Sequence, residues 1–576
     1  MSSFITQMDQ HQSKNIGENG HLQHGWSNDT EDKLCQLYFQ LVRSEDHTDL
    51  EKQWRQIITK FINKNNTIND TLLPEFINII KLIANVRDVI DGKGEQKLSF
   101  MLLYNLYIHF PFIAQYLFIK FIIIEDTHCF GSMKDIKYFC NYIREKSGNP
   151  NHSFINHIVN LSCDILKLDE SRYIKNESIS LFGKWFPRAK SKKFGWINKK
   201  LSCQYYKNIM STTTTTNQRY KAEKKCETLI RKLLSKLNKY LDTPQIKMSS
   251  NLWADIDFNK VTGPTLRIHK KAFQNLDEKN RIRNNNSDRI ECAENLKKHL
   301  QDAINGKTVV KGKRVDMYKL VQDALSTSTQ EDIDMVNEQW KDNSSINKET
   351  EHYIIPMSDT SSSMTCDSNI PLYNSIGFGI RISEKTHPVF KHRILTFSDT
   401  PTWFQLNKDM TFHQKVNVMK NDNSWGGATN FYKGMEMILN VCVKYDVHPS
   451  EVSKMILAIF SDMQIGLANT NGLNMATMME NIKMLYIEGG LKTKWKKAYT
   501  VPHILFWNLK KTNGFPSTVY EKNTSMISGY SPALLNTFTD KGVGELKETT
   551  PYCMLVNILN NPRYNFINEI ISKYYS

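Results

Sequence analysis

The chain has 576 residues, and 40% of them are hydrophobic, which is enough for two packed cores and excludes a wholly disordered chain. Lys and Arg (75) outnumber Asp and Glu (59), and the formal net charge of +16 favours an acidic partner such as nucleic acid or an anionic membrane surface. The alternative is that the abundance of Asn, Ile and Lys reflects AT-biased codons, in which case the charge indicates no partner.

Residues 1–30 are polar and aperiodic and lack the apolar core of a secretory signal, so we expect a disordered tail. The ten cysteines are scattered singly without a CxxC pair, which is typical of reduced thiols in an intracellular protein, with the cytoplasm as the expected compartment. The most hydrophobic run, residues 110–124, is shorter than the roughly 20 residues of a spanning helix and contains Lys120. We therefore expect a buried helix there and no membrane partner.

Residues 31–345 are expected to form an α-helical domain, because apolar residues recur at spacings of three and four while strand-like alternation is scarce. The segments with this pattern are 34–42, 54–62, 73–90, 97–110, 136–143, 155–166 and 228–241. Successive amphipathic helices with short connections predict a HEAT-like α-solenoid, although no repeat period is clean. The run STTTTTN (211–217) is expected to be a surface loop.

The pattern changes after a polar stretch, residues 342–350, which we interpret as an interdomain linker. Short apolar runs suited to buried parallel strands follow at 352–357, 393–398, 455–461 and 503–509. Helical patterns lie between them at 371–383, 430–445 and 475–487. This alternation predicts a doubly wound α/β domain over residues 350–576, and such sheets bind ligands at the carboxyl ends of their strands.

The first of these strands leads into a DxSxS pattern formed by Asp359, Ser361 and Ser363. Alternate residues of an extended turn point the same way, so the three side chains can converge on one point. Their hard oxygen atoms suit Mg²⁺ or Mn²⁺ better than zinc. Alone, the pattern is equally compatible with a serine-rich turn that caps the next helix.

Two later segments favour a metal site. A glycine turn at 425–429, WGGAT, delivers the hydroxyl of Thr429 to the start of a helix, and the strand at 455–461 is followed by Asp462. The order DxSxS, GG-x-T and strand-Asp resembles the metal-ion-dependent adhesion site of von Willebrand A domains. Ser362 is a departure, because many such domains have glycine there. The resemblance implies an Mg²⁺ or Mn²⁺ ion that accepts a further carboxylate from a partner, and its ligands would be Asp359, Ser361, Ser363, Thr429 and Asp462.

Residues 184–200, KWFPRAKSKKFGWINKK, combine basic and aromatic side chains without an acid. Cations that neutralise phosphates beside rings that stack on unpaired bases are typical of single-stranded RNA binding. The alternative is an exposed loop anchored by its aromatic rings, with solvated lysines. The candidate RNA-contacting residues are Lys184, Trp185, Arg188, Lys190, Lys192, Lys193, Trp196, Lys199 and Lys200.

From about residue 80 onward the chain resembles an uncharacterised family, found in plants, fungi, bacteriophages and giant viruses, that joins a helical region to a C-terminal von Willebrand A domain. Besides the metal segments, the matching segments are NVRD (85–88), GKGE (92–95), GSMKD (131–135), SLFGKWFPR (180–188) and SGYSP (528–532). The layout is more distantly similar to the Ro ribonucleoproteins, whose ring of helical repeats binds small noncoding and misfolded RNAs. The Asn-rich composition suits a giant-virus member, whose compartment would be that of the host.

Three functions remain open. The first is a Ro-like scaffold that holds single-stranded or structured RNA in its helical domain and recruits an acidic protein ligand at its metal site. The second is a protein-interaction adaptor without a role in nucleic-acid binding. The third and least favoured is a metal-dependent hydrolase, because no general base is evident; we expect a binding protein rather than an enzyme. The RNA or protein partner, the closure of the helices into a ring and the oligomeric state are not decided by the sequence.

Overall fold

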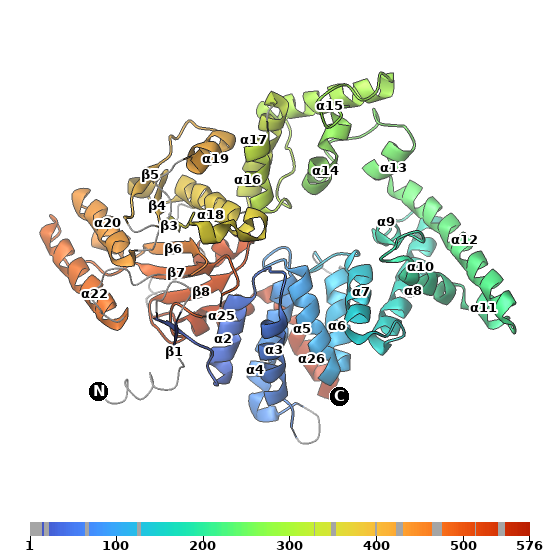
Figure 1. The fold of residues 1–576 in the computed structure, drawn as a ribbon, viewed down its shortest axis with the longest axis horizontal. Coiled ribbons are helices and arrows are strands. Elements are labelled where there is room, and N and C mark those ends of the chain that lie inside the picture. Colours follow the sequence, from blue (N-terminus) through green and yellow to red (C-terminus); the bar gives the residue numbers. More distant parts are fainter. Residues whose placement is uncertain are drawn as a thin grey trace.

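The computed structural model describes residues 14–16, 22–63, 68–123, 128–327, 329–346, 353–397, 400–421, 430–463, 475–512, 514–539 and 548–575. It contains an N-terminal helical region and a C-terminal domain built on a mixed sheet (Figure 1). This division agrees with the helix and strand patterns of the sequence.

The helical region begins at α2 (Thr30–Gln40) and ends at α17 (Gln330–Ser344). Side chains that accept a hydrogen bond from the first-turn amides fix several helix starts, among them Asp29 before α2 and Thr215, the capping box of α12. The other helices are α3 (Thr48–Lys60), α4 (Leu73–Arg87), α5 (Gln96–His109), α6 (Pro111–Ile122), α7 (Asp135–Ser147), α8 (Ser153–Ile174), α9 (Phe182–Trp185), α10 (Gly195–Tyr205), α11 (Lys207–Ser211), α12 (Thr216–Leu241), α13 (Pro244–Ser249), α14 (Gly263–Phe273), α15 (Ser287–Ile304) and α16 (Met317–Ser326).

These helices follow an arc that returns to its own start. In Figure 1 the arc leaves the sheet at α2, passes through α8 and α12, and comes back through α14 to α16 and α17, which pack on the sheet domain. Two contacts join its ends. The Arg314 guanidinium donates to the Val89 carbonyl at 3.0 Å, and the Arg43 guanidinium lies 3.5 Å from the Tyr318 hydroxyl.

The sheet of the C-terminal domain has the order β5-β4-β3-β6-β7-β8. All neighbours are parallel except β5, which pairs antiparallel with β4 at the edge. The four strands predicted from apolar runs are present, whereas short β5 and β8, with its small polar residues, gave no comparable signal. The strands are β3 (Ile354–Ser358), β4 (Arg393–Thr396), β5 (Trp403–Gln405), β6 (Ile456–Ser461), β7 (His503–Asn508) and β8 (Thr524–Ser528).

Helices cover the sheet, so its central strands are buried along their whole length. Three of these helices correspond to the predicted segments 371–383, 430–445 and 475–487. The helices are α18 (Cys366–Lys385), α19 (Phe412–Asn421), α20 (Phe431–Lys444), α21 (Pro449–Val452), α22 (Met475–Lys492), α23 (Asn536–Thr539), α25 (Pro551–Leu559) and α26 (Phe566–Tyr575).

The helical region and the sheet domain share one hydrophobic core. The last two helices explain this, because α25 packs on α2 and α4 while α26 packs on α4 and α6. A second, separate core lies within the part of the helical region that contains α14, α15 and α17. Its buried residues are Trp253, Ile256, Phe258, Val261, Leu266, Phe273, Cys292, Leu296, Leu300, Ala303, Val310 and Met335.

Two stretches differ from the sequence-based expectation. The expected disordered tail contains two paired antiparallel strands, β1 (Lys14–Ile16) and β2 (Leu22–His24). The residues from β2 to Thr30 pack on the sheet domain: the His24 amide donates to the Phe515 carbonyl at 3.1 Å, and the Trp26 ring meets the Phe515 ring edge-on at 5.1 Å. Residues 342–344 of the expected linker belong to α17. Asn343 is buried there, and its side-chain amide donates hydrogen bonds to the Gly312 and Val315 carbonyls.

The expectations for the apolar run and the cysteines can also be compared with the structure. The apolar run forms α6, whose inward face is buried, and no helix in the described part of the chain is long and apolar enough to cross a bilayer. All ten cysteines lie in described segments, and none is in a disulfide.

Candidate metal site and nucleic-acid interface

The two predicted carboxylate ligands lie together at the carboxyl edge of the sheet. Asp359 follows β3 and Asp462 follows β6, and these neighbouring parallel strands flank the point where the strand order reverses. The Asp359 amide donates to the Phe460 carbonyl at 3.0 Å, which holds the loop after β3 against the end of β6. Open α/β sheets bind their ligands at such a switch point.

The DxSxS loop folds so that its polar atoms converge. Ser361 and Ser363 place their hydroxyl oxygens 2.8 Å apart, and the Ser361 amide donates to one oxygen of Asp359 at 2.8 Å. The other Asp359 oxygen accepts a hydrogen bond of 2.6 Å from the Ser461 hydroxyl. A turn that presents two hydroxyls beside a held carboxylate provides the hard oxygen ligands that Mg²⁺ prefers.

The two buried carboxylates at this edge of the sheet also favour a bound cation. Asp359 and Asp462 are only 2% and 1% exposed. Burial, and next the neighbouring Asp462 carboxylate, raise the pKa of Asp359 to about 6. Two buried like charges are costly unless a cation lies between them. One cation does lie there: the Lys510 ammonium, from the residue two after β7, is 3.5 Å from an Asp462 oxygen.

The fifth predicted ligand, Thr429, lies outside the described residues, as does its whole glycine turn at 425–429. The structure therefore brings Asp359, Ser361, Ser363 and Asp462 to one sheet edge and leaves the position of Thr429 as a prediction. Within the described segments no three His, Cys, Asp or Glu side chains gather as a metal cluster, so the candidate site depends on hydroxyl ligands beside its two carboxylates.

The arc of helices surrounds a cavity of about 2010 Å³. Its lining comes from the loops after α2, α4 and α6, from α9, α12 and α14, and from the loop after β8. Of the described residues that line it, three are acidic: Glu95, Glu227 and Asp316. Its basic residues are Arg43, Arg87, Lys93, Lys97, Lys134, Lys184, Arg188, Lys190, Lys224, Arg231, Lys313, Arg314 and Lys319. This excess makes the cavity a positively charged enclosure, because low-dielectric walls focus the field of like charges.

Several of these cations are available to a ligand. Arg43, Lys224 and Lys319 are paired with the three acids of the lining, and Arg87 is paired with buried Asp135. Lys93 and Arg314 donate hydrogen bonds to other parts of the protein. Among the described residues, seven further lining cations have neither an ion-pair partner nor a side-chain hydrogen bond: Lys97, Lys134, Lys184, Arg188, Lys190, Arg231 and Lys313.

The candidate RNA-contacting residues of 184–200 divide between the cavity and the outer surface. Four line the cavity: Lys184, Trp185, Arg188 and Lys190. Of the other five, Lys199 pairs with Glu223 at 2.8 Å and Lys200 donates to the Pro150 carbonyl at 3.0 Å. The remaining three lie away from the lining: Lys192, Lys193 and Trp196.

One part of the lining concentrates positive charge beside an aromatic ring. Lys137 stands 5.2 Å from the centre of the Trp185 ring, and burial, then Arg188 and Lys134, lower the pKa of its ammonium. Across the cavity, burial and then Lys184 lower the pKa of His269 on α14. Cations that repel one another around a half-buried ring form a site that a phosphate and its base could occupy.

Most lining cations outside 184–200 gave no local sequence signal. Lys97, Lys134, Arg231 and Lys313 come from segments far apart in the chain, and only the closed arc brings them together. The family segments NVRD, GKGE and SGYSP have a structural role instead. The Lys93 ammonium, 3% exposed, donates to the Tyr38 carbonyl at 2.6 Å and to the Ser528 hydroxyl at 2.5 Å, and so ties the helical region to the end of β8.

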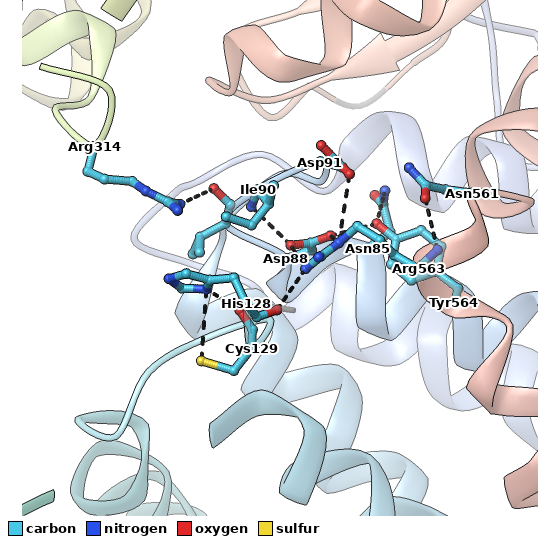
Figure 2. Close-up of polar contacts among 11 residues, drawn as sticks. Asn85, Asp88, Ile90, Asp91, His128, Cys129, Arg314, Asn561, Arg563 and Tyr564 are labelled. Atoms are coloured by element: carbon cyan, nitrogen blue, oxygen red, sulfur yellow. Dashed lines mark hydrogen bonds and ion pairs between the residues drawn. The ribbon is translucent and has the colours of Figure 1, made fainter. Parts of the chain in front are cut away.

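A second junction between the two regions is drawn in Figure 2. Arg563, from the turn before α26, grips the Asp88 carboxylate with two hydrogen bonds of 2.9 and 3.0 Å, and Tyr564 donates to the same carboxylate at 3.2 Å. Arg314 approaches from the other end of the arc, where it meets the Val89 carbonyl. This corner of the cavity therefore joins three distant parts of the chain.

Comparison with known proteins divides the chain at the same place as the fold. Residues 154–348 match a family described as Domain of unknown function (DUF2828), and residues 353–559 match Domain of unknown function (DUF7788). The chain is also similar to the Uncharacterized protein L728 of Acanthamoeba polyphaga mimivirus, with 27% identity over 511 residues, or 85% of this chain and 81% of that protein. These similarities indicate an uncharacterised family with a giant-virus member.

Proposed function

We propose that the protein is an RNA-binding scaffold of Ro-like layout, in which the helical arc holds RNA and a von Willebrand A-type domain carries the metal site. The observation that carries the proposal is the cavity, whose described lining has thirteen basic residues and three acidic ones. Single-stranded RNA or a single-stranded end of a structured RNA suits such an enclosure, because phosphates can follow the cations while bases stack on Trp185.

Two features support the von Willebrand A-type assignment. The strand order, with one antiparallel edge strand and the reversal between β3 and β6, is that of a doubly wound sheet. The loops after those two strands carry the DxSxS turn and Asp462. When bound, Mg²⁺ or Mn²⁺ would supply an electrophilic centre for a partner's carboxylate, and Asp359, Ser361, Ser363, Asp462 and, by resemblance, Thr429 would hold it.

The RNA proposal is tested by binding of a labelled single-stranded RNA and of a structured RNA at 50 mM and 200 mM salt. Among the described residues, seven cavity cations without an ion pair or a side-chain hydrogen bond predict a steep salt dependence, with log Kd changing by about 0.7 per phosphate neutralised for each tenfold change in salt. A Lys134→Glu, Arg188→Glu variant is expected to lose this binding, while the control Lys192→Glu, Lys193→Glu, outside the cavity, keeps most of it. Absence of binding by the unmodified chain at low salt would remove the proposal.

The metal site also supports a second candidate function, a protein-interaction adaptor, because its recognition chemistry does not require RNA. A partner captured by the full chain in the presence of nuclease, and released by EDTA or lost with Asp359→Ala, would favour the adaptor. Capture that depends on RNA would favour the scaffold.

A further inference from the structure

Lys510 follows β7 by two residues and its side chain enters the candidate metal site. Its ammonium lies 3.5 Å from an oxygen of Asp462 and 3.5 Å from the carbonyl oxygen of Ser363. It therefore contacts both of the segments that would hold a divalent ion, the DxSxS loop and the end of β6.

We propose that Lys510 is a built-in counter-ion of this site, which neutralises it when no metal is bound and must withdraw when Mg²⁺ or Mn²⁺ enters. The inference rests on the metal site of the proposed function and names a residue that sets its affinity. Lys510 thus sets the affinity of the site and is not itself a ligand.

The burial of the carboxylates explains why a resident cation is needed. Asp359 and Asp462 are almost inaccessible, and a pair of buried carboxylates without a counter-charge would be strongly destabilising. Two hydrogen bonds stabilise the Asp359 carboxylate, and the Lys510 ammonium lies against the Asp462 carboxylate. In the metal-free protein the ammonium therefore offsets part of the charge of these two carboxylates.

The same geometry makes the ammonium and the metal ion alternatives. A divalent ion coordinates its oxygen ligands at 2.0 to 2.6 Å, as is usual for Mg²⁺ and Ca²⁺, which would leave it a few ångströms from the present position of the Lys510 nitrogen. At such a distance the divalent ion and the Lys510 ammonium would repel each other.

Lys510 can withdraw because its backbone is held independently of its side-chain contacts. Its amide donates to the Asn508 side chain at 3.0 Å, and Asn508 in turn donates to the Phe39 carbonyl at 3.1 Å. The side chain is 23% exposed, against 1% for Asp462, so the flexible stem has a route to solvent.

The first test measures Mn²⁺ affinity of the full chain by titration calorimetry. Lys510→Met removes the charge and keeps the apolar stem, and we expect it to bind Mn²⁺ about tenfold more tightly or better. Lys510→Arg keeps the charge and is expected to show no such gain. Lys511→Met is the matched control, because the neighbouring Lys511 ammonium contacts the Asp46 carbonyl and Asp49 instead.

The second test follows the amine itself by acetylation with a soluble acyl ester and mass spectrometry. Lys510 should react slowly in the metal-free protein and several-fold faster with saturating Mg²⁺, while Lys511 reacts at one rate. Equal Mn²⁺ affinity of the unmodified chain and Lys510→Met, or labelling of Lys510 that ignores Mg²⁺, overturns the counter-ion role alone. Failure of both chains to bind Mn²⁺ overturns the metal site itself.

Discussion

Arg563 and Asp88 form a two-pronged ion pair that joins the C-terminal helix to the helical region, across 475 residues of chain. Asp88 is fully buried and Arg563 is mostly buried, with a side chain 15% exposed. The pair lies beside the cavity, where Arg314 closes the arc (Figure 2). The integrity of the cavity is therefore linked to residues near the end of the sequence.

Arg563→Ala is expected to destabilise the whole protein. Removal of one partner of a buried pair leaves an uncompensated charge and usually costs about 3–5 kcal/mol. Tyr564 and the Ile90 amide still donate to Asp88, so the lower part of that range is expected. The measurement is the free energy of unfolding in urea.

The control for this prediction is an exposed ion pair of the same domain. Lys522 and Glu548 are 2.6 Å apart, but their side chains are 69% and 74% exposed. Lys522→Ala should leave stability unchanged within error, because exposed pairs contribute little. Equal stability of Arg563→Ala and the unmodified chain would show that the junction does not hold the two regions together.

Asp359→Asn is expected to abolish stabilisation by Mg²⁺. An ion that binds only the folded state stabilises it by about 2.7 kcal/mol at a hundred times its Kd, which thermal unfolding detects. The amide keeps the shape of the carboxylate: its oxygen can accept from the Ser361 amide, and its NH2 group can donate to the Ser461 hydroxyl. Loss of the Mg²⁺ response would therefore report the charge rather than misfolding. Asp409→Asn, an exposed change in the same domain, should respond as the unmodified chain does.

Trp185→Ala and Trp196→Ala should affect RNA binding differently, although the two rings are eleven residues apart. Trp185 lines the cavity, and loss of a stacked base costs about 1–3 kcal/mol of binding free energy, or roughly 5- to 150-fold in Kd. The Trp196 ring instead packs beneath the Arg144 guanidinium at 4.9 Å, outside the cavity. Its removal should lower the melting temperature without a comparable loss of affinity, as measured by fluorescence anisotropy.

The sequence was informative where physical signals are local. Helical periodicity and apolar runs located eleven of the 24 described helices, α2 to α8 among them, and four of the six strands of the large sheet. Burial of one face or of a whole strand leaves a pattern in consecutive residues. Asp359 and Asp462 were found because each follows such a run.

Features that depend on tertiary structure left no such signal. The closure of the arc depends on the hydrogen bond from Arg314 to Val89, 225 residues away. The cavity is lined by single cations, such as Lys134 and Arg231, from different parts of the chain. Part of the basic segment lies outside the cavity for the same reason. Lys199 pairs with Glu223, and Lys200 donates to the Pro150 carbonyl, both on neighbouring elements. Lys510 was not singled out either, since nothing in consecutive residues indicates that its ammonium reaches Asp462.

The central claim is that the cavity holds RNA, and photo-crosslinking tests it most directly. A 4-thiouridine-labelled single-stranded RNA bound to the full chain at low salt is irradiated, and the modified peptides are mapped by mass spectrometry. We predict crosslinks at the lining, above all in the peptide with Trp185 and Arg188 and in the peptide with Lys134. Crosslinks confined to the outer surface around Lys192 and Lys193, with none at the lining, would contradict it.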